Sequence, residues 1–97
     1  MTRAKAEATL TAENTFTPEV SLLDIFNISI TGTWDGTLHL QRKKPGESSF
    51  LDVEDWLSSD TTEIQEVGTE IESGVVYKLG FKTGNFNSGS AVVRLSQ

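Results

Sequence analysis

The stretch that decides the fold class reads V-V-Y-K-L-G-F-K (75–82), T-G-N-F-N-S-G-S (83–90) and A-V-V-R-L (91–95). Apolar residues occupy every second position from Val75 to Phe81 and again from Ala91 to Leu95. Successive side chains of a strand point to opposite faces, so both runs are typical of half-buried strands. The glycines and asparagines between them tolerate positive φ and favour a turn. We therefore predict an antiparallel hairpin here.

The rest of the chain carries similar short alternating runs. They cover residues 6–13, 26–31, 33–43, 50–56 and 63–67, with Gly32 breaking the second from the third and a Pro-Gly turn at 45–46. About seven short strands separated by turn signals are the pattern of an all-β domain, a small antiparallel β-sandwich or barrel. Residues 20–26 are ambiguous between one helical turn, begun by Thr17-Pro18-Glu19, and a strand.

The alternation also predicts which side chains are buried. The expected core is Phe26, Ile28, Ile30, Leu38, Leu40, Val53, Tyr77, Leu79, Phe81, Val93 and Leu95. We expect Trp34 and Trp56 at the edge of this core. A chain of 97 residues forms one domain, and a domain of this size has a modest core and is only marginally stable.

The N-terminal residues 1–20 differ from the domain at 21–97. Small alanines alternate with polar residues from Ala6 to Glu13, which favours an extended arm or an edge strand with little burial. A helix is the alternative, because alanine and glutamate favour helices. The segment lacks the apolar core of a signal peptide, and nowhere is there an apolar run of membrane-spanning length. We expect a protein made in a cytoplasm, or released from one by lysis.

Charge is unevenly distributed along the chain, whose net charge is −6. No lysine or arginine lies between Lys44 and Lys78, and the acidic residues of this stretch are Glu47, Asp52, Glu54, Asp55, Asp60, Glu63, Glu66, Glu70 and Glu72. The acidic balance disfavours nucleic-acid binding. The stretch is interpreted as a solvated face, with contact to a basic partner or a weak calcium site as alternatives. Its spacing does not match an EF-hand, and there is no cysteine, so no metal site is predicted.

No catalytic motif or cofactor site emerges from the sequence. His39 has neither cysteine nor a second histidine to join it and is expected on the polar surface of a strand. Arg42, Lys43 and Lys44 form a basic turn, which either aids solubility or contacts an acidic surface. Trp34, Trp56 and Phe86 would mark a glycan or protein contact if they were exposed together.

Several blocks resemble small structural proteins of tailed bacteriophages. They are F-N-I-S-I-T-G-T-W (26–34), G-T-L-H-L-Q-R (36–42), Y-K-L-G (77–80), T-G-N-F (83–86), S-G (88–89) and V-R-L-S-Q (93–97). In that family an F-N-x-S-x-x-G strand precedes a G-T-x-x-L-Q-R strand, and a T-G-x-(F/Y)-x-S-G segment precedes V-R-L-S-Q. The resemblance covers roughly residues 22–97. This chain departs from it at 44–50, where the relatives carry an aspartate-glycine turn and then a tryptophan.

The resemblance implies a virion component with an Ig-like or related β-sandwich. The implied role is a capsid decoration or cement protein on the head exterior, bound to the major capsid protein, with a tail or neck component or a glycan-binding module as alternatives. We expect a homo-oligomer, no enzymatic activity and no membrane partner. The residues predicted to form protein interfaces are Arg3, Lys5, Leu10, Phe16, Arg42, Lys43, Lys44 and Phe86. Residues 1–20 are predicted to reach a neighbouring copy or the major capsid protein.

Overall fold

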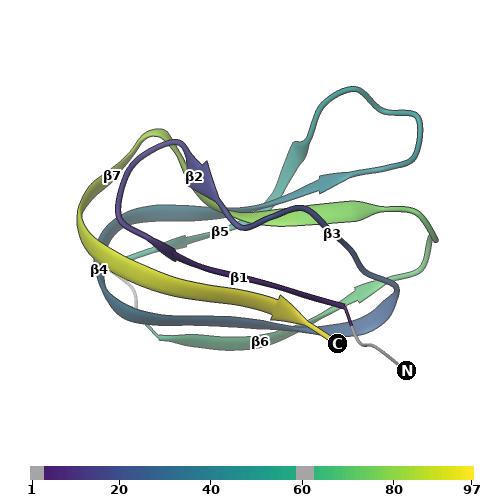
Figure 1. Cartoon of the computed structure of the whole chain (residues 1–97), viewed down its shortest axis with the longest axis horizontal. Coiled ribbons are helices and arrows are strands. Elements are labelled where there is room, and N and C mark those ends of the chain that lie inside the picture. The colour runs from purple at the N-terminus through teal and green to yellow at the C-terminus, as the bar shows by residue number, and fades with distance from the viewer. Residues whose placement is uncertain (1–3, 59–62) are drawn as a thin grey trace.

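The computed structural model describes residues 4–58 and 63–97, which form strands and connecting loops with no helix among them. The strands are β1 (Lys5–Leu10), β2 (Thr15–Phe16), β3 (Val20–Ser21), β4 (Asp24–Lys43), β5 (Leu51–Leu57), β6 (Ile64–Glu70) and β7 (Val76–Ser96) (Figure 1). They belong to one seven-stranded sheet, and all the strand pairings among the described residues are antiparallel. The all-β, antiparallel prediction is confirmed.

Two long strands, β4 and β7, pass through both layers of a sandwich. The C-terminal half of β7 and the N-terminal half of β4 lie side by side, flanked by β1 and β6. The other halves of β7 and β4 pair as well, flanked by β2 and β3 on one side and by β5 on the other. The sheet therefore folds over on itself where β4 and β7 bend (Figure 1).

The predicted hairpin at 75–95 is wrong, because residues 76–95 all belong to one continuous strand, β7. β7 pairs with β4 from Val76↔Lys43 to Ser96↔Asn27, and the two halves of β7 do not pair with each other. Leu38 is opposite Phe81 and Gly36 is opposite Phe86, so residues 82–85 of β7 lie opposite Thr37 alone. The extra residues form a bulge, and a bulge bends a strand and increases its twist.

Gly32 does not break the run either, because β4 continues through it with a positive φ of 101°. Gly89 of β7, paired with Trp34, has a φ of 91° in the same region. A Cβ atom on Gly89 would overlap the carbonyl oxygen of Thr33. Glycine is needed there both for its conformation and for the close approach of the two backbones. The glycines that predicted strand ends in the sequence therefore lie inside strands, where the strands bend.

We expect Gly89→Ala to lower the free energy of unfolding by about 2–4 kcal/mol, since a strained φ costs about 1–3 kcal/mol and the backbone overlap adds to it. Gly84→Ala is the matched control. Gly84 also lies in β7 with a φ of 85°, but an added Cβ would meet nothing within 4 Å. Urea unfolding of both variants measures the difference. Equal losses would show that the backbone approach at Gly89 carries no cost.

The core lies between the two layers and contains every predicted residue except Val53, which is 49% exposed. It also contains residues that were not predicted, namely Leu10, Leu22, Ile64, Val75 and Ala91. β5 is an edge strand whose pairing with β4 shifts register between Leu40 and Gln41, and Val53 is the extra residue there. Trp56 faces inward opposite Leu38 instead. Trp34 and Trp56, expected at the core edge, are 3% and 8% exposed, and both belong to the buried cluster.

The N-terminal segment lies along β7 as an edge of both layers. β1 pairs from Lys5↔Ser96 to Leu10↔Ala91, and Ala6 and Leu10 are buried. The ambiguous residues after it form β3 and the start of β4, without a helical turn. The reach of residues 1–20 to a neighbour stays a prediction. To reach a neighbour, this segment would have to break the pairing of β1 with β7 and expose Leu10.

Candidate protein-interaction surfaces

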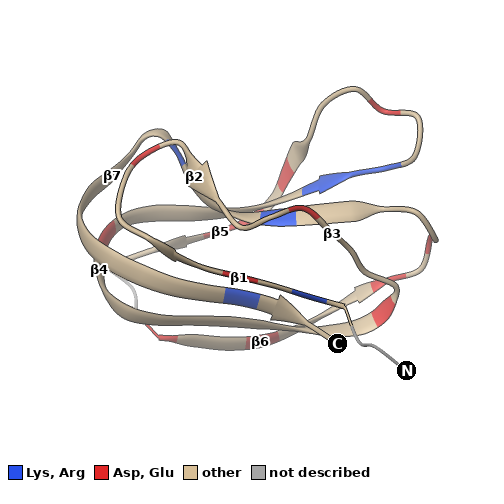
Figure 2. Ribbon diagram, viewed as in Figure 1, with Lys and Arg blue, Asp and Glu red and all other residues tan. Residues whose placement is uncertain are grey.

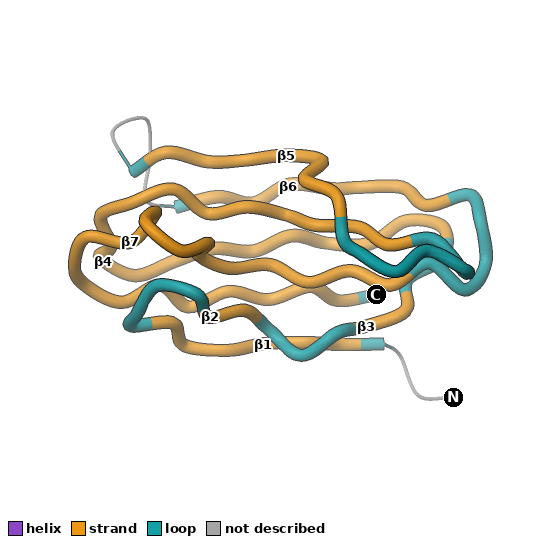
Figure 3. Tube along the Cα trace, turned by 90° about the horizontal axis from the view of Figure 1, so that it is seen from above, coloured by secondary structure: helices purple, strands orange, loops and turns teal. Residues whose placement is uncertain are grey.

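The strands of the acidic stretch that the structure describes, β5 and β6, form one side of the sandwich. β5 and β6 lie on this side, and β1, β2 and β3 lie on the opposite side (Figure 3). Acidic residues recur along β5 and β6, as the red segments in Figure 2 show. Asp52 is neutralised by Lys82, whose Nζ lies 2.7 Å from Oδ2, and its pKa is lowered chiefly by that contact. We call Glu54, Asp55 and Glu66 on these two strands the acidic side.

Two carboxylates of the acidic side, both exposed, lie close together at the edge of the sandwich that β5 and β6 form. Glu66 of β6 accepts a 2.9 Å hydrogen bond from Nε1 of Trp56 on β5. The pKa of Glu54 is raised, first by partial burial and then by the charge of Glu66. Neither carboxylate makes an ion pair with a basic side chain in the part of the chain that the structure describes. This side therefore carries unneutralised negative charge.

The predicted basic turn is divided, because Arg42 points into the sandwich. Its guanidinium donates bidentate hydrogen bonds of 2.5 and 2.8 Å to Glu70, which is 2% exposed. Tyr77 donates a 2.7 Å hydrogen bond to the same carboxylate. Arg42 lowers the pKa of Glu70 to about 2, whereas burial, with Glu70 as the next cause, raises the pKa of Tyr77 to about 12. Glu70 of one layer thus ties Arg42 and Tyr77 of the other.

We expect Glu70→Gln to lower the free energy of unfolding by about 3 kcal/mol, because it leaves Arg42 without its carboxylate. The control Glu72→Gln, at an exposed position, should change stability by less than about 0.5 kcal/mol. A depressed pKa stabilises the fold at pH above the unfolded value of 4.5, and this stabilisation is lost as pH falls towards 2.

Chemical denaturation from pH 7 to pH 2 measures this linkage. The difference between wild type and Glu70→Gln should be constant at neutral pH and shrink below about pH 4.5. A difference that stays constant down to pH 2 would contradict the assigned role of the carboxylate.

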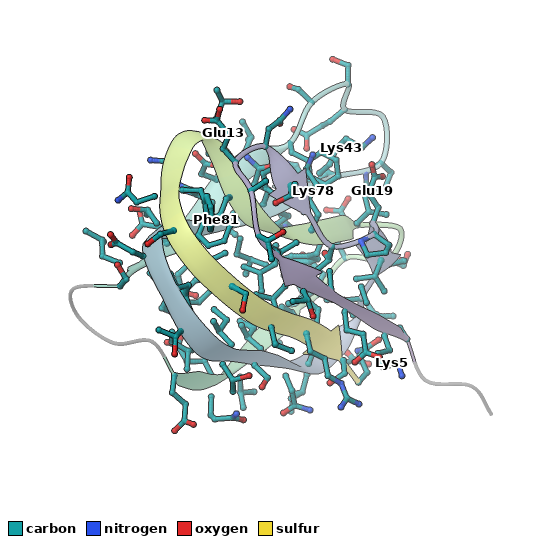
Figure 4. The ribbon with its side chains drawn as sticks, turned by 60° about the vertical axis from the view of Figure 1, so that its left-hand side comes forward. Lys5, Glu13, Glu19, Lys43, Lys78 and Phe81 are labelled. Carbon is teal, nitrogen blue, oxygen red and sulfur yellow. The ribbon has the colours of Figure 1, made fainter. Side chains whose placement is uncertain are left out.

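Lys43 and Lys78 instead lie on the outside of the sheet against aromatic rings. Nζ of Lys78 is 4.5 Å from the ring centroid of Phe16 and 4.5 Å from that of Phe50, and Nζ of Lys43 is 5.2 Å from the latter. Figure 4 shows the two lysines close together. Neither makes an ion pair within residues 4–58 and 63–97. We call Phe16, Lys43, Phe50 and Lys78 the basic–aromatic patch.

The other residues predicted for interfaces are scattered. Lys5 is exposed and pairs with Glu7 at 3.3 Å, whereas Leu10 is a core residue. Lys44 is exposed beside the patch, and Phe86 is half-buried with its ring 4.9 Å from that of Phe81. Arg3 lies outside the described residues. The structure thus brings together only Phe16 and Lys43, with Lys44 next to them, and adds Phe50 and Lys78, which sequence reasoning missed.

The condition for an exposed aromatic contact is not met, because Trp34 and Trp56 are buried and leave no exposed groove with Phe86. One further prediction needs correction. His39, expected on the surface, has only 12% of its side chain exposed, with Nδ1 3.9 Å from Oδ2 of Asp52. No group of three or more metal-ligating side chains occurs among the described residues, and no helix in that part could span a membrane.

β5 exposes an apolar surface that the sequence did not predict. Leu51, Val53 and Leu57 are 59%, 49% and 44% exposed. On the neighbouring edge strand of the other layer, Val67 of β6 is 66% exposed. The signal was present in L-D-V-E-D-W-L (51–57), where apolar residues occur in both alternating sets. The bulge at Val53 changes the alternation, so Leu51 lies opposite Arg42, Leu57 lies opposite Thr37 and only Trp56 is buried.

Comparison with known proteins leaves the surface chemistry as the guide to function. No family model, no curated protein and no solved structure matches this chain.

Proposed function

We propose that this chain is a non-enzymatic structural protein of a tailed-phage virion, and specifically a decoration or cement protein on the outside of the head. The sequence blocks described above and the β-sandwich support this proposal. Its partner is the major capsid protein lattice, and its place is the capsid exterior after assembly in the host cytoplasm. A protein that binds only the assembled lattice stabilises that lattice by mass action.

The observation that carries the proposal is the apolar surface of β5. Leu51, Val53 and Leu57 expose roughly half of their surface to water. Burying apolar surface contributes roughly 25 cal/mol per Å², so covering these side chains with a partner is favourable. Exposed apolar side chains edged by charged ones are found at protein-interaction sites. The acidic residues of the same strand, Asp52 and Glu54, discourage it from pairing indiscriminately with other strand edges.

Copy number in purified virions tests the role. We expect quantitative mass spectrometry to find this chain at a ratio close to that of the major capsid protein, because a decoration protein occupies a repeated lattice site. A handful of copies per particle would place the protein in the tail or neck instead. Absence from the particle would overturn the proposal.

A pair of substitutions tests the surface. We expect Val53→Asp to weaken binding to capsids lacking this protein by roughly tenfold or more, since a buried charge in an interface costs more than 1 kcal/mol. Val92→Asp is the matched control: Val92 is 45% exposed, but it lies on β7 in the other layer. Co-sedimentation with capsids measures both affinities. Equal effects of the two changes would remove β5 as the docking strand.

A further inference from the structure

We propose that the basic–aromatic patch of one copy docks on the acidic side of a second copy. The chain would then associate with itself through two different surfaces, each of which carries charges that the monomer leaves unneutralised. This contact goes beyond the capsid-binding role and does not depend on it.

The basic–aromatic patch is built to present cations. Lys78 lies between the rings of Phe16 and Phe50, which come from β2 and from the loop before β5. Cation–π contact fixes an ammonium group without cancelling its charge. All four side chains of the patch are half-buried. Their mobility is therefore already restricted, and binding a partner costs little side-chain entropy. The chemistry that fits is a carboxylate.

The acidic side offers that chemistry. Glu54 and Glu66 face each other from two edge strands, and their proximity disfavours full ionisation of both. A lysine ammonium placed between them relieves this repulsion. Leu57 and Val67 on the same strands are also exposed, but the register turns them to the outer faces of the two layers. The complementarity between the two sites is therefore one of charge.

A second copy is favoured over strand addition by a foreign segment. β5 and β6 are the free edges on this side, but Glu66 points inward from its edge strand, where a charged side chain opposes pairing with another strand. Docking through side chains avoids that obstacle. Because the two surfaces differ, each copy can use both, and such heterologous contacts close into rings or extend into open chains.

Sedimentation velocity over a range of concentrations tests the contact on the full chain. We expect wild type to self-associate at low salt and to dissociate as salt rises, because exposed charge pairs are screened. Lys78→Glu replaces the central cation of the basic–aromatic patch by an anion. Glu54→Lys places a cation on the acidic side, where it can pair with Glu66. Each variant alone should associate at least roughly tenfold more weakly, since juxtaposed like charges are costly.

The decisive experiment mixes the Lys78→Glu and Glu54→Lys variants. The Lys78→Glu copy keeps its acidic side and the Glu54→Lys copy keeps its patch, so an equimolar mixture should form a complex although neither protein does so alone. Lys5→Glu is the matched control, because Lys5 lies far from the patch in Figure 4 and the change in net charge is the same. Circular dichroism confirms that each variant is folded.

The same data can overturn the proposal. A wild type that stays monomeric at every concentration and salt would do so, as would association that is insensitive to salt and survives both variants, which would indicate pairing of strand edges. Failure of the folded variants to complement each other in the mixture would also refute the contact.

Discussion

The continuous pairing of β4 with β7 is the constraint on which the structure depends. Every other strand is attached to one of these two: β1, β2 and β3 pair with β7, and β5 and β6 pair with β4. Because both long strands bend together, each layer contains half of each. The bend needs glycine where the backbones approach, and the far end needs the tie between Glu70, Arg42 and Tyr77. Between these two points the apolar side chains close the core.

Alternation in the sequence predicted the core well because it depends only on local geometry. From Phe26 to Ile30 and from Tyr77 to Phe81 the inward side chains are those that the pattern indicates. That residues 76–96 form one continuous strand was not predictable in the same way, since glycine and asparagine suit a hairpin turn and a bulged bend equally. The choice between them is made by the partner strand, and a local pattern carries no information about it, because at the bulge Leu38 pairs with Phe81 and Gly36 with Phe86, both distant in the chain.

The charged interaction surfaces were visible in the sequence as an uneven distribution of charge. The gap in basic residues between Lys44 and Lys78 indicated an acidic region, and the fold turns it into one side of the sandwich. Which charges are neutralised depends on contacts distant in sequence: Arg42 meets Glu70, and Lys82 meets Asp52. The aromatic contacts of Lys78 likewise join residues from three parts of the chain. Alternation places Arg42 and Lys43 on opposite faces, but it does not reveal that Glu70 lies beside the inward one.

That alternation explains how one short run serves two purposes. At the end of β4, Arg42 faces the interior and Lys43 the exterior, so consecutive cations meet different chemistry. The guanidinium of Arg42 is neutralised by the buried carboxylate of Glu70, and this ion pair links the two layers. The outward cation rests on a ring that leaves its charge available to a partner. A charged strand end can therefore stabilise the fold and present a binding surface without either use competing with the other.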